Sequence, residues 1–326
     1  MISSLPYSPL LFKSTPVLSS TVNLLHTFKN GQTYTFQSTP QGGVYGVGVG
    51  RFWELKYSED GKGILWRGTG TQEELDDYLA LKIDYDEVEK TLDPKDSFAV
   101  NGFKKGRGMR LLRQDPWETF VGFLFSQNNN VPRIEAMVRG LCAKFGPLLY
   151  TREGTPIHGF PSVEKVSTLS ISDLSTLGLG YRADYLLKSA QKLHALGGEG
   201  YLLKLRDNPD PDVQAKELKQ FPGVGPKVAD CISLFSLDCL SLVPVDTHMR
   251  QIYENTYKQP KKRPYTEARD YLRAKFGGKY AGVVQTILFT FETSQFRPSP
   301  PMKESDRGSR SASLEDKRKV KGNNHH

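Results

Sequence analysis

The sequence predicts an α+β fold in which an antiparallel β-sheet domain precedes an all-α domain. Between Thr21 and about Gly70, short runs of β-branched and aromatic residues alternate with glycine-containing turns. From Asp115 onward, segments with apolar residues at helical spacing follow one another, often with a proline at the start and a glycine at the end. A chain of 326 residues is long enough to form two such domains.

Hairpin signals support the sheet. In TVNLLHTFKNGQTYTFQ (21–37), the Asn30-Gly31 pair predicts a tight turn between two strands. VYGVGVGRFWELKYS (44–58) and GILWRG (63–68) continue the strand pattern. The glycines of GVGVGR do not predict a dinucleotide-binding loop, because no helix follows them.

An acidic, helical stretch from Glu73 to Asp96 follows the strands. We interpret it as a solvated face that is turned away from any nucleic acid. The polar, charged C-terminus predicts disorder. The expected organisation is an irregular lead-in (1–20), a sheet domain with the acidic helix (21–112), a helical domain (113–300) and a disordered basic tail (301–326).

Charge and cysteine content narrow the class of protein. Lys and Arg total 44 against 36 Asp and Glu, with a pI of about 9.2, which favours a polyanionic partner such as nucleic acid. Three cysteines without close pairing indicate a reduced, intracellular protein. No apolar run approaches the about 20 residues of a membrane span, so we expect no membrane partner. Histidines and cysteines form no pairs at zinc-site spacing, and we expect neither a metal nor a cofactor.

The stretch FPGVGPKVADC (221–231) predicts two helices joined by a tight hairpin. Gly223 and Gly225 would allow positive φ and a close approach to another surface, and Pro226 fits the first turn of the second helix. The free backbone N–H groups of that turn form an anion site, so this helix-hairpin-helix predicts binding of a DNA phosphate. The alternative is a plain helical hairpin with a glycine turn.

Lys227 lies at the start of that second helix, where the helix dipole and partial burial favour the uncharged, nucleophilic amine. Asp246, in VPVDTHM, is expected to cap the next helix as an ionised carboxylate. Taken singly, a surface lysine and an ordinary N-cap aspartate are the simpler interpretations. Because both residues lie on a helix-hairpin-helix frame, we expect the two helix starts to converge into a catalytic pair.

From about Thr21 to Thr293 the sequence resembles eukaryotic 8-oxoguanine DNA glycosylases of the helix-hairpin-helix superfamily. The resemblance is carried, in family order, by NGQTYTF, MRLLRQDPWE, SQNNNVPRI, LGLGYRADY, PGVGPKVADC, VPVDTHM and AGVVQTILF. It implies a TATA-binding-protein-like sheet domain and a bifunctional base-excision-repair enzyme that flips the damaged nucleotide out of the duplex. Lys227 would form a Schiff base with the sugar, Asp246 would stabilise the developing positive charge, and β-elimination would cleave the strand as an AP lyase.

The resemblance also implies how the damaged base is bound. Cys231 lies one helical turn after Lys227, and Gln285 and Phe289 share the same spacing. In the family the base lies between such a cysteine and phenylalanine, while the glutamine reads its pairing edge. The Gly31 carbonyl would accept from N7–H of 8-oxoguanine, where guanine has a lone pair. Alternatively, Gln285 and Phe289 are simply a helix face with Phe289 in the core.

Further residues are implied to contact the DNA. Asn128, Arg133 and Arg182 would contact the orphan cytosine, with Tyr181 wedged into the base stack, so that excision opposite cytosine is preferred. His248 would face a phosphate beside the flipped nucleotide. The simpler interpretations are a polar interhelix turn for the NNN stretch and a core histidine.

Other kinds of helix-hairpin-helix protein are the alternatives. Relatives that carry an iron–sulfur cluster use four closely spaced cysteines, which this chain lacks, and alkylation-specific relatives lack the lysine. A non-catalytic DNA-binding module and a glycosylase for another oxidised purine stay open, the latter because Phe235 and Arg250 depart from the family pattern.

The expected partner is double-stranded DNA containing 8-oxoguanine, bound by a monomer. We expect a nuclear location, and leave a mitochondrial pool open. The DKRKVK stretch (316–321) is either a nuclear import signal or a charged, solvated tail.

Overall fold

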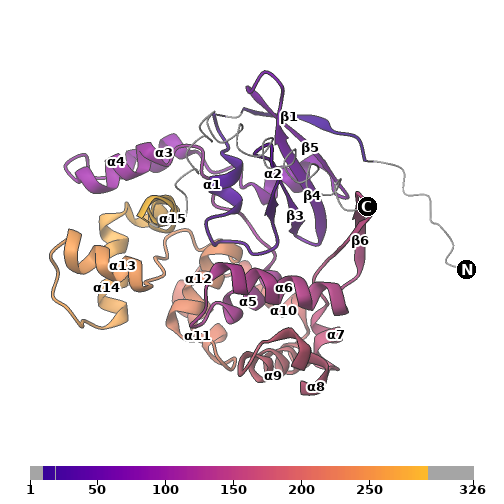
Figure 1. Ribbon diagram of the computed structural model, residues 1–326. Coiled ribbons are helices and arrows are strands. Elements are labelled where there is room, and N and C mark those ends of the chain that lie inside the picture. The colour runs from indigo at the N-terminus through magenta and orange to yellow at the C-terminus, as the bar shows by residue number, and fades with distance from the viewer. Residues whose placement is uncertain (1–9, 19, 293–326) are drawn as a thin grey trace, which may run out of the picture. The chain divides into compact units, whose positions relative to one another are not determined.

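The computed structural model describes residues 10–18 and 20–292. A five-stranded sheet with two short helices lies beside a larger group of helices, which confirms the predicted α+β class (Figure 1). The predicted disordered tail, 301–326, and its DKRKVK stretch lie outside the described residues, as do residues 1–9 of the predicted lead-in. None of the helices in the described part of the chain has the length and apolar character needed to cross a bilayer.

The main sheet is antiparallel throughout, with the strand order β1-β5-β4-β3-β2. A two-residue turn at Val49 and Gly50, both with positive φ, joins β3 to β4, because such a turn matches the twist of the strands. The strands are β1 (Lys13–Leu18), β2 (Gln37–Ser38), β3 (Val44–Gly48), β4 (Arg51–Tyr57) and β5 (Gly63–Gly68).

Strand β4 buries four consecutive residues, 52–55, because both faces of the sheet are covered. On one face, Trp53 belongs to the same apolar cluster as residues of helices α1 and α2. On the other face, Phe52 stacks on Tyr150 with ring centroids 4.6 Å apart, and Glu54 pairs with Arg152 at 2.9 Å. These two partners lie on β6 (Leu148–Arg152), which forms a hairpin with β7 (Thr155–His158). This hairpin interrupts the region that was predicted to be all-α.

Two N-terminal predictions are wrong. Residues 13–18 of the predicted irregular lead-in form edge strand β1, in which Lys13 is paired with Trp66 of β5. The first half of the predicted hairpin around Asn30-Gly31 is helix α1 (Leu24–Phe28). Asn23 caps this helix by accepting from the His26 N–H at 2.9 Å. The buried residues of α1 recur at helical rather than strand spacing, and this burial outweighs the local turn signal.

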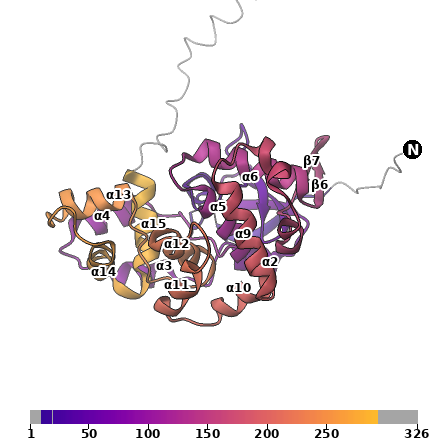
Figure 2. The ribbon, with the colours of Figure 1, turned by 90° about the horizontal axis from the view of Figure 1, so that it is seen from below.

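The acidic stretch forms helices α2 and α3, which, with α4 directly after it, divide between two cores. Helix α2 (Gln72–Tyr78) packs into the cluster of the sheet, whereas α3 (Tyr85–Lys90) and α4 (Ser97–Lys105) contribute to the cluster of the helical region. Helix α4 packs against α15, and Figures 1 and 2 both show the two helices close together. The stretch is therefore amphipathic rather than only a solvated face.

The helical region is built around two apolar helices, α5 and α12, which pack against each other. Every residue of α5 except Glu118 is buried, as is every residue of α12 from Val228 to Ser236. The helices of this region are α5 (Pro116–Phe125), α6 (Val131–Phe145), α7 (Val163–Ser167), α8 (Ile171–Leu174), α9 (Arg182–Ala195), α10 (Glu199–Arg206), α11 (Pro211–Lys219), α12 (Pro226–Ser236), α13 (Thr247–Gln251), α14 (Tyr265–Lys275) and α15 (Ala281–Glu292), with shorter turns η1 (Ser175–Leu177), η2 (Ile252–Thr256) and η3 (Gly278–Tyr280).

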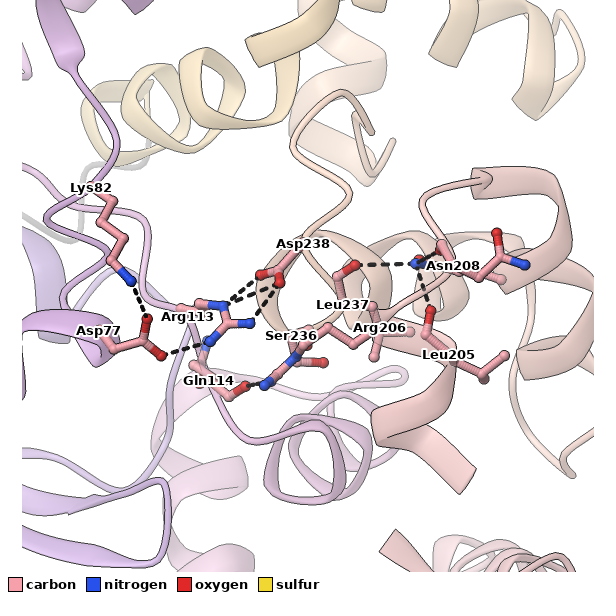
Figure 3. A network of polar contacts seen from close by, with 11 residues as sticks. Asp77, Lys82, Arg113, Gln114, Leu205, Arg206, Asn208, Ser236, Leu237 and Asp238 are labelled. Carbon is pink, nitrogen blue, oxygen red and sulfur yellow. Dashed lines mark hydrogen bonds and ion pairs between the residues drawn. The ribbon is translucent and has the colours of Figure 1, made fainter. Parts of the chain in front are cut away.

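A charged contact joins the sheet region to the helices. Arg113 donates to both carboxylate oxygens of Asp238, at 2.8 Å from Nε and from Nη2, and to Asp77 at 2.6 Å (Figure 3). Asp77 belongs to α2, and Asp238 follows α12. We call these three residues the Arg113 seam. It ties the segment that follows α12 to helix α2 of the sheet region.

Candidate active site

The structure contains the predicted helix-hairpin-helix, with α11 and α12 joined by residues 220–225. Gly223 has φ +81°, and a Cβ there would lie 2.4 Å from the Tyr185 ring, so both the backbone conformation and the space require glycine. Gly225 has φ −88° and open space around it, so the prediction that it needs positive φ is wrong. It is exposed at the start of α12, where Pro226 is the first helical residue as predicted.

Lys227 occupies the first turn of α12 and is partly buried. Its Nζ lies 5.2 Å from the centroid of the Phe123 ring, and Phe123 in turn stacks on Phe235 with an interplanar angle of 6°. The amine also lies close enough to the thiol of Cys231, one turn further along the helix, to lower the pKa of that thiol. An aromatic wall and a thiol therefore hold the amine on the inner side of the helix start.

Cys231 links the two predicted catalytic residues electrostatically. Burial raises the pKa of this thiol to about 11, Lys227 opposes that rise, and Asp230 and Asp246 add to it. Since such interactions fall off with distance, Lys227 and Asp246 both lie near Cys231. The thiol is 2% exposed and uncharged near pH 7, so it would present a neutral, polarizable surface to a ligand.

Asp246 is the N-cap of α13, as predicted, and its Oδ1 accepts from the Met249 N–H at 2.9 Å. Helix α13 also carries His248, which is exposed rather than in the core. The His248 ring meets the Phe289 ring edge to face, with centroids 5.6 Å apart. The structure therefore brings His248, from α13, together with Phe289, from α15.

Gln285 is buried on α15, and its Oε1 has no hydrogen-bond partner among the described residues. Helix α15 packs against α12 one turn earlier, where a Cβ on Gly282 would lie 2.4 Å from Leu234. A buried carbonyl without a partner costs roughly 1–3 kcal/mol, so a donor supplied by a ligand would be favourable there. The half-buried Phe289 follows one turn later on the same helix.

The loop that contains Gly31 is held by a residue that sequence reasoning missed. Gly31 has φ +86°, as its place in a turn requires. The next residue, Gln32, is 2% exposed, donates to the carbonyls of Thr27 at 2.6 Å and Arg110 at 2.9 Å, and accepts from the Leu112 N–H at 2.9 Å. A polar residue beside a glycine turn was the available signal, but two of its three partners, Arg110 and Leu112, lie about 80 residues further along the chain.

The Gly31 loop also reaches the helices. Tyr34 is buried against Gly122 of α5, where a Cβ would lie 2.9 Å from the Tyr34 ring. Burial and the neighbouring Cys231 raise the pKa of Tyr34, which places this loop near the same cysteine as Lys227 and Asp246. A Cβ on Gly31 itself would meet Val131, at the start of α6, at 3.7 Å.

The three residues predicted to contact the orphan base, and Tyr181, predicted to wedge into the base stack, gather around the turn between α5 and α6. Asn128 is exposed with φ +45°, and Tyr181 is 50% exposed and donates to the Gln127 carbonyl at 3.3 Å. Arg133 is exposed and reaches the Gly178 carbonyl at 3.4 Å. Tyr185 connects this group to the hairpin, since its ring meets Tyr181 edge to face at 5.6 Å and packs against Gly223.

Arg182 differs from the others in this group because it is buried, with 3% exposure. Its guanidinium donates to the carbonyls of Gln127, Asn128 and Leu179. In this structure it stabilises the turn, and a contact with a base would require some of these hydrogen bonds to be exchanged. Among the residues described, no set of three or more His, Cys, Asp or Glu side chains is arranged to hold a metal ion.

Comparison with known proteins agrees with this arrangement. The family model described as 8-oxoguanine DNA glycosylase, N-terminal domain, matches residues 15–120. The model described as HhH-GPD superfamily base excision DNA repair protein matches residues 121–276. Together the two models cover the sheet region and most of the helical region, so the resemblance inferred from the motifs is confirmed.

Curated relatives and solved structures are similar over large parts of the chain. An N-glycosylase/DNA lyase of Arabidopsis thaliana is 40% identical over 225 residues, and one of Saccharomyces cerevisiae is 34% identical over 215 residues. The matches cover 66% and 57% of this chain, and 60% and 57% of those relatives, so the chain spans less than two thirds of their length. A Clostridium acetobutylicum 8-oxoguanine glycosylase/lyase, solved with double-stranded DNA containing cytosine opposite 8-oxoG, superposes with a TM-score of 0.76 at 27% identity, over 86% of this chain and 97% of that one.

Proposed function

The chain belongs to the HhH-GPD superfamily of base excision DNA repair proteins and carries the N-terminal domain of the 8-oxoguanine DNA glycosylases, and from this premise we propose that it excises 8-oxoguanine from double-stranded DNA and then cleaves the strand. The observation that carries the proposal is the pair of helix starts around Cys231. Lys227 supplies an amine there, and the N-cap Asp246 supplies a carboxylate.

The reaction follows from these two groups. The Lys227 amine attacks C1′ of a flipped-out nucleotide, the C1′–N9 bond breaks, and the base leaves with the bonding electrons and takes up a proton. The Asp246 carboxylate stabilises the positive charge that develops on the sugar. Opening of the sugar ring gives a Schiff base, loss of a C2′ proton then breaks the C3′–O3′ bond, and the downstream strand leaves with its 5′-phosphate.

The groups around the pair account for recognition of the base. Cys231 and Phe289 offer a thiol and an aromatic ring for the two faces of a planar ligand, and the unpaired Oε1 of Gln285 accepts from its pairing edge. The Gly31 carbonyl accepts from N7–H of 8-oxoguanine. One such contact is worth roughly 1–3 kcal/mol against guanine, so discrimination must be shared among several contacts.

The exposed residues Asn128, Arg133 and Tyr181 form the surface that replaces the flipped nucleotide and contacts the orphan cytosine. His248 and the N–H groups beyond Gly223 and Gly225 bind phosphates, since each lies at the exposed start of a helix. We propose that the protein acts as a monomer on nuclear DNA.

Borohydride trapping tests the proposal. Wild-type protein mixed with a duplex that holds 8-oxoguanine opposite cytosine should give a covalent protein–DNA adduct, because borohydride reduces the Schiff base. Lys227→Gln should bind this duplex within a few-fold of the wild-type affinity, but its excision rate should fall by at least about 10³-fold and no adduct should form. Lys216→Gln, which removes an exposed lysine from α11, is the matched control and should react like wild type.

Each contrary outcome has a separate meaning. If the wild-type protein binds the duplex but gives neither excision nor an adduct, the protein is a DNA-binding module without catalysis. Excision by Lys227→Gln would show that another group is the nucleophile. Rates measured with the lesion opposite each of the four bases, and with a different oxidised purine, would show whether 8-oxoguanine opposite cytosine is the preferred substrate.

A further inference from the structure

A buried chain of polar contacts runs from α12 to the residue that precedes Asp246. The Tyr265 hydroxyl, at the start of α14, donates to Asp230 Oδ2 at 2.7 Å. The backbone N–H of Val245 donates to the same hydroxyl oxygen at 3.2 Å. Asp230 lies on α12, three residues after Lys227, and is 1% exposed. The reaction described above uses neither Tyr265 nor Asp230.

The direction of each hydrogen bond is fixed by chemistry. A backbone N–H can only donate, so the Tyr265 oxygen accepts from Val245 and its own hydrogen is directed to the carboxylate. Arg269, one turn further along α14, lies 3.8 Å from the other oxygen of Asp230. Burial raises the pKa of Asp230 to about 6, and the Tyr265 and Arg269 contacts oppose that rise. The carboxylate is therefore ionised near pH 7.5, where it accepts most strongly.

These contacts connect the two helix starts of the candidate site. Lys227 and Asp230 lie in the first two turns of one rigid helix, and Val245 is bonded through a single peptide to Asp246. A carboxylate so deeply buried is costly, which makes it an unusual choice where a neutral acceptor would serve packing alone. The carboxylate lies beside the helical turn that carries Lys227, so a role in the candidate site accounts for the cost of burying it.

We propose that Tyr265 and Asp230 are positioning residues that hold the Asp246 carboxylate at its working distance from the Lys227 amine. This inference rests on the function proposed above. Without the Tyr265 hydroxyl, the Val245 N–H loses its partner and the Val245–Asp246 peptide is free to shift relative to α12. A displacement of about 1 Å in a reacting group commonly slows catalysis by about 100-fold, while contacts to the rest of the substrate are unaffected.

The test compares Tyr265→Phe with Tyr271→Phe. Both substitutions remove one hydroxyl from α14, but the Tyr271 hydroxyl accepts from Gln259, and among the described residues it makes no hydrogen bond to Val245 or Asp230. The single-turnover rate of 8-oxoguanine excision should fall about 10- to 100-fold in Tyr265→Phe. Affinity for a duplex with a non-cleavable abasic analogue should stay within about three-fold, and Tyr271→Phe should leave both quantities unchanged.

A double-mutant cycle separates positioning from a general loss of stability. If Tyr265 acts through Asp246, its removal should slow excision much less in an Asp246→Asn background than in the wild type. Asp230→Asn keeps an oxygen that accepts from Tyr265, so it should retain most of the rate that Asp230→Ala loses. Thermal unfolding of each variant shows that the assayed protein is folded.

The inference is overturned if Tyr265→Phe matches Tyr271→Phe, if its rate loss is the same in both backgrounds, or if DNA affinity falls in parallel with the rate. Wild-type protein without excision activity would instead refute the proposed function.

Discussion

The Arg113 seam and the candidate site differ in whether their polar groups have hydrogen-bond partners. In the seam, the Arg113 guanidinium meets two carboxylates, and each carboxylate receives at least one of its hydrogens (Figure 3). In the site, the buried Gln285 Oε1 has no hydrogen-bond partner among the described residues, and neither has Nδ2 of the buried Asn30, which precedes Gly31 in the loop. The seam is complete in the free protein, whereas the site holds donors and acceptors that only a bound molecule could satisfy.

This contrast separates stability from function. A network in which every polar group has a hydrogen-bond partner stabilises the fold whether or not a ligand is bound. An unpaired buried polar group costs free energy until a ligand pairs with it. Some buried atoms outside the site, such as Arg152 Nε and Ser233 Oγ, also lack a partner within the described part of the chain, and Gln214 shows how such a group can be structural. Gln214 also has an unpaired Oε1, but its amide hydrogens bind the carbonyls of Leu205, Asn208 and Leu237, so its role is structural.

The largest expected effect compares the two buried glutamines. Gln285→Ala should slow 8-oxoguanine excision by about 100-fold, because a contact to the pairing edge of the base is lost, and should leave the melting temperature nearly unchanged. Gln214→Ala should do the reverse, with a clearly lower melting temperature and near-normal excision by the folded protein. Single-turnover kinetics and calorimetry on both variants provide the measurements. Equal effects of the two substitutions on excision would end the distinction.

Asp230 is a buried carboxylate that lies beside the site, and both of its oxygens have partners. Its pKa of about 6 in the folded protein exceeds the usual value of about 3.9 in an unfolded chain, so the folded state holds the proton more tightly. The stabilisation from this group is complete below about pH 4 and is lost as the pH rises through 6. Relative to wild type, Asp230→Asn should therefore gain roughly 2 kcal/mol of unfolding free energy between pH 4 and pH 7.

Denaturant unfolding at several pH values checks this expectation, and Asp212→Asn, an exposed acid on α11, is the control. The quantity of interest is the change with pH of the difference between variant and wild type, so a pH-independent loss of packing cancels. A difference that stays constant from pH 4 to pH 7 would contradict an elevated pKa at Asp230.

The smallest expected effect concerns the seam itself. Arg113→Met should lower the free energy of unfolding by about 1 kcal/mol, because its carboxylate partners are partly exposed and screened by water. Excision by the folded variant should be unaffected. Arg51→Met, which breaks the more exposed pair with Glu74, should cost less still. Urea denaturation of both variants ranks them, and an excision defect in Arg113→Met would mean that the seam also serves the site.

The sequence predicted the parts of the site that depend on local order. Pro226 at the first position of α12 and Asp246 as the cap of α13 are both as expected, since capping is set by a few consecutive residues. Whether the site residues have their proposed roles stays a prediction. The prediction of a strand around Leu24 was wrong because burial of a helical face outweighed a turn signal.

Long-range partners could not be predicted in the same way. Nothing in the order of residues links Gln32 to Leu112, or Tyr265 to both Asp230 and Val245. The β6–β7 hairpin was missed because its strands are short and lie between helical segments, and it is stabilised by Phe52 and Glu54, nearly 100 residues earlier. These features depend on packing between distant segments.

Helices α3 and α4 limit where the chain can be cut into separately folded fragments. They precede the helical region in the chain but complete its interior, where Gly102 is in such close contact with Leu288 that a Cβ would lie 2.2 Å from it. A fragment that begins at Arg113 would leave the Leu288 side of α15 bare to water. Expressed alone, such a fragment should self-associate through that bared surface, and adding residues 84–105 as a separate peptide should restore its solubility.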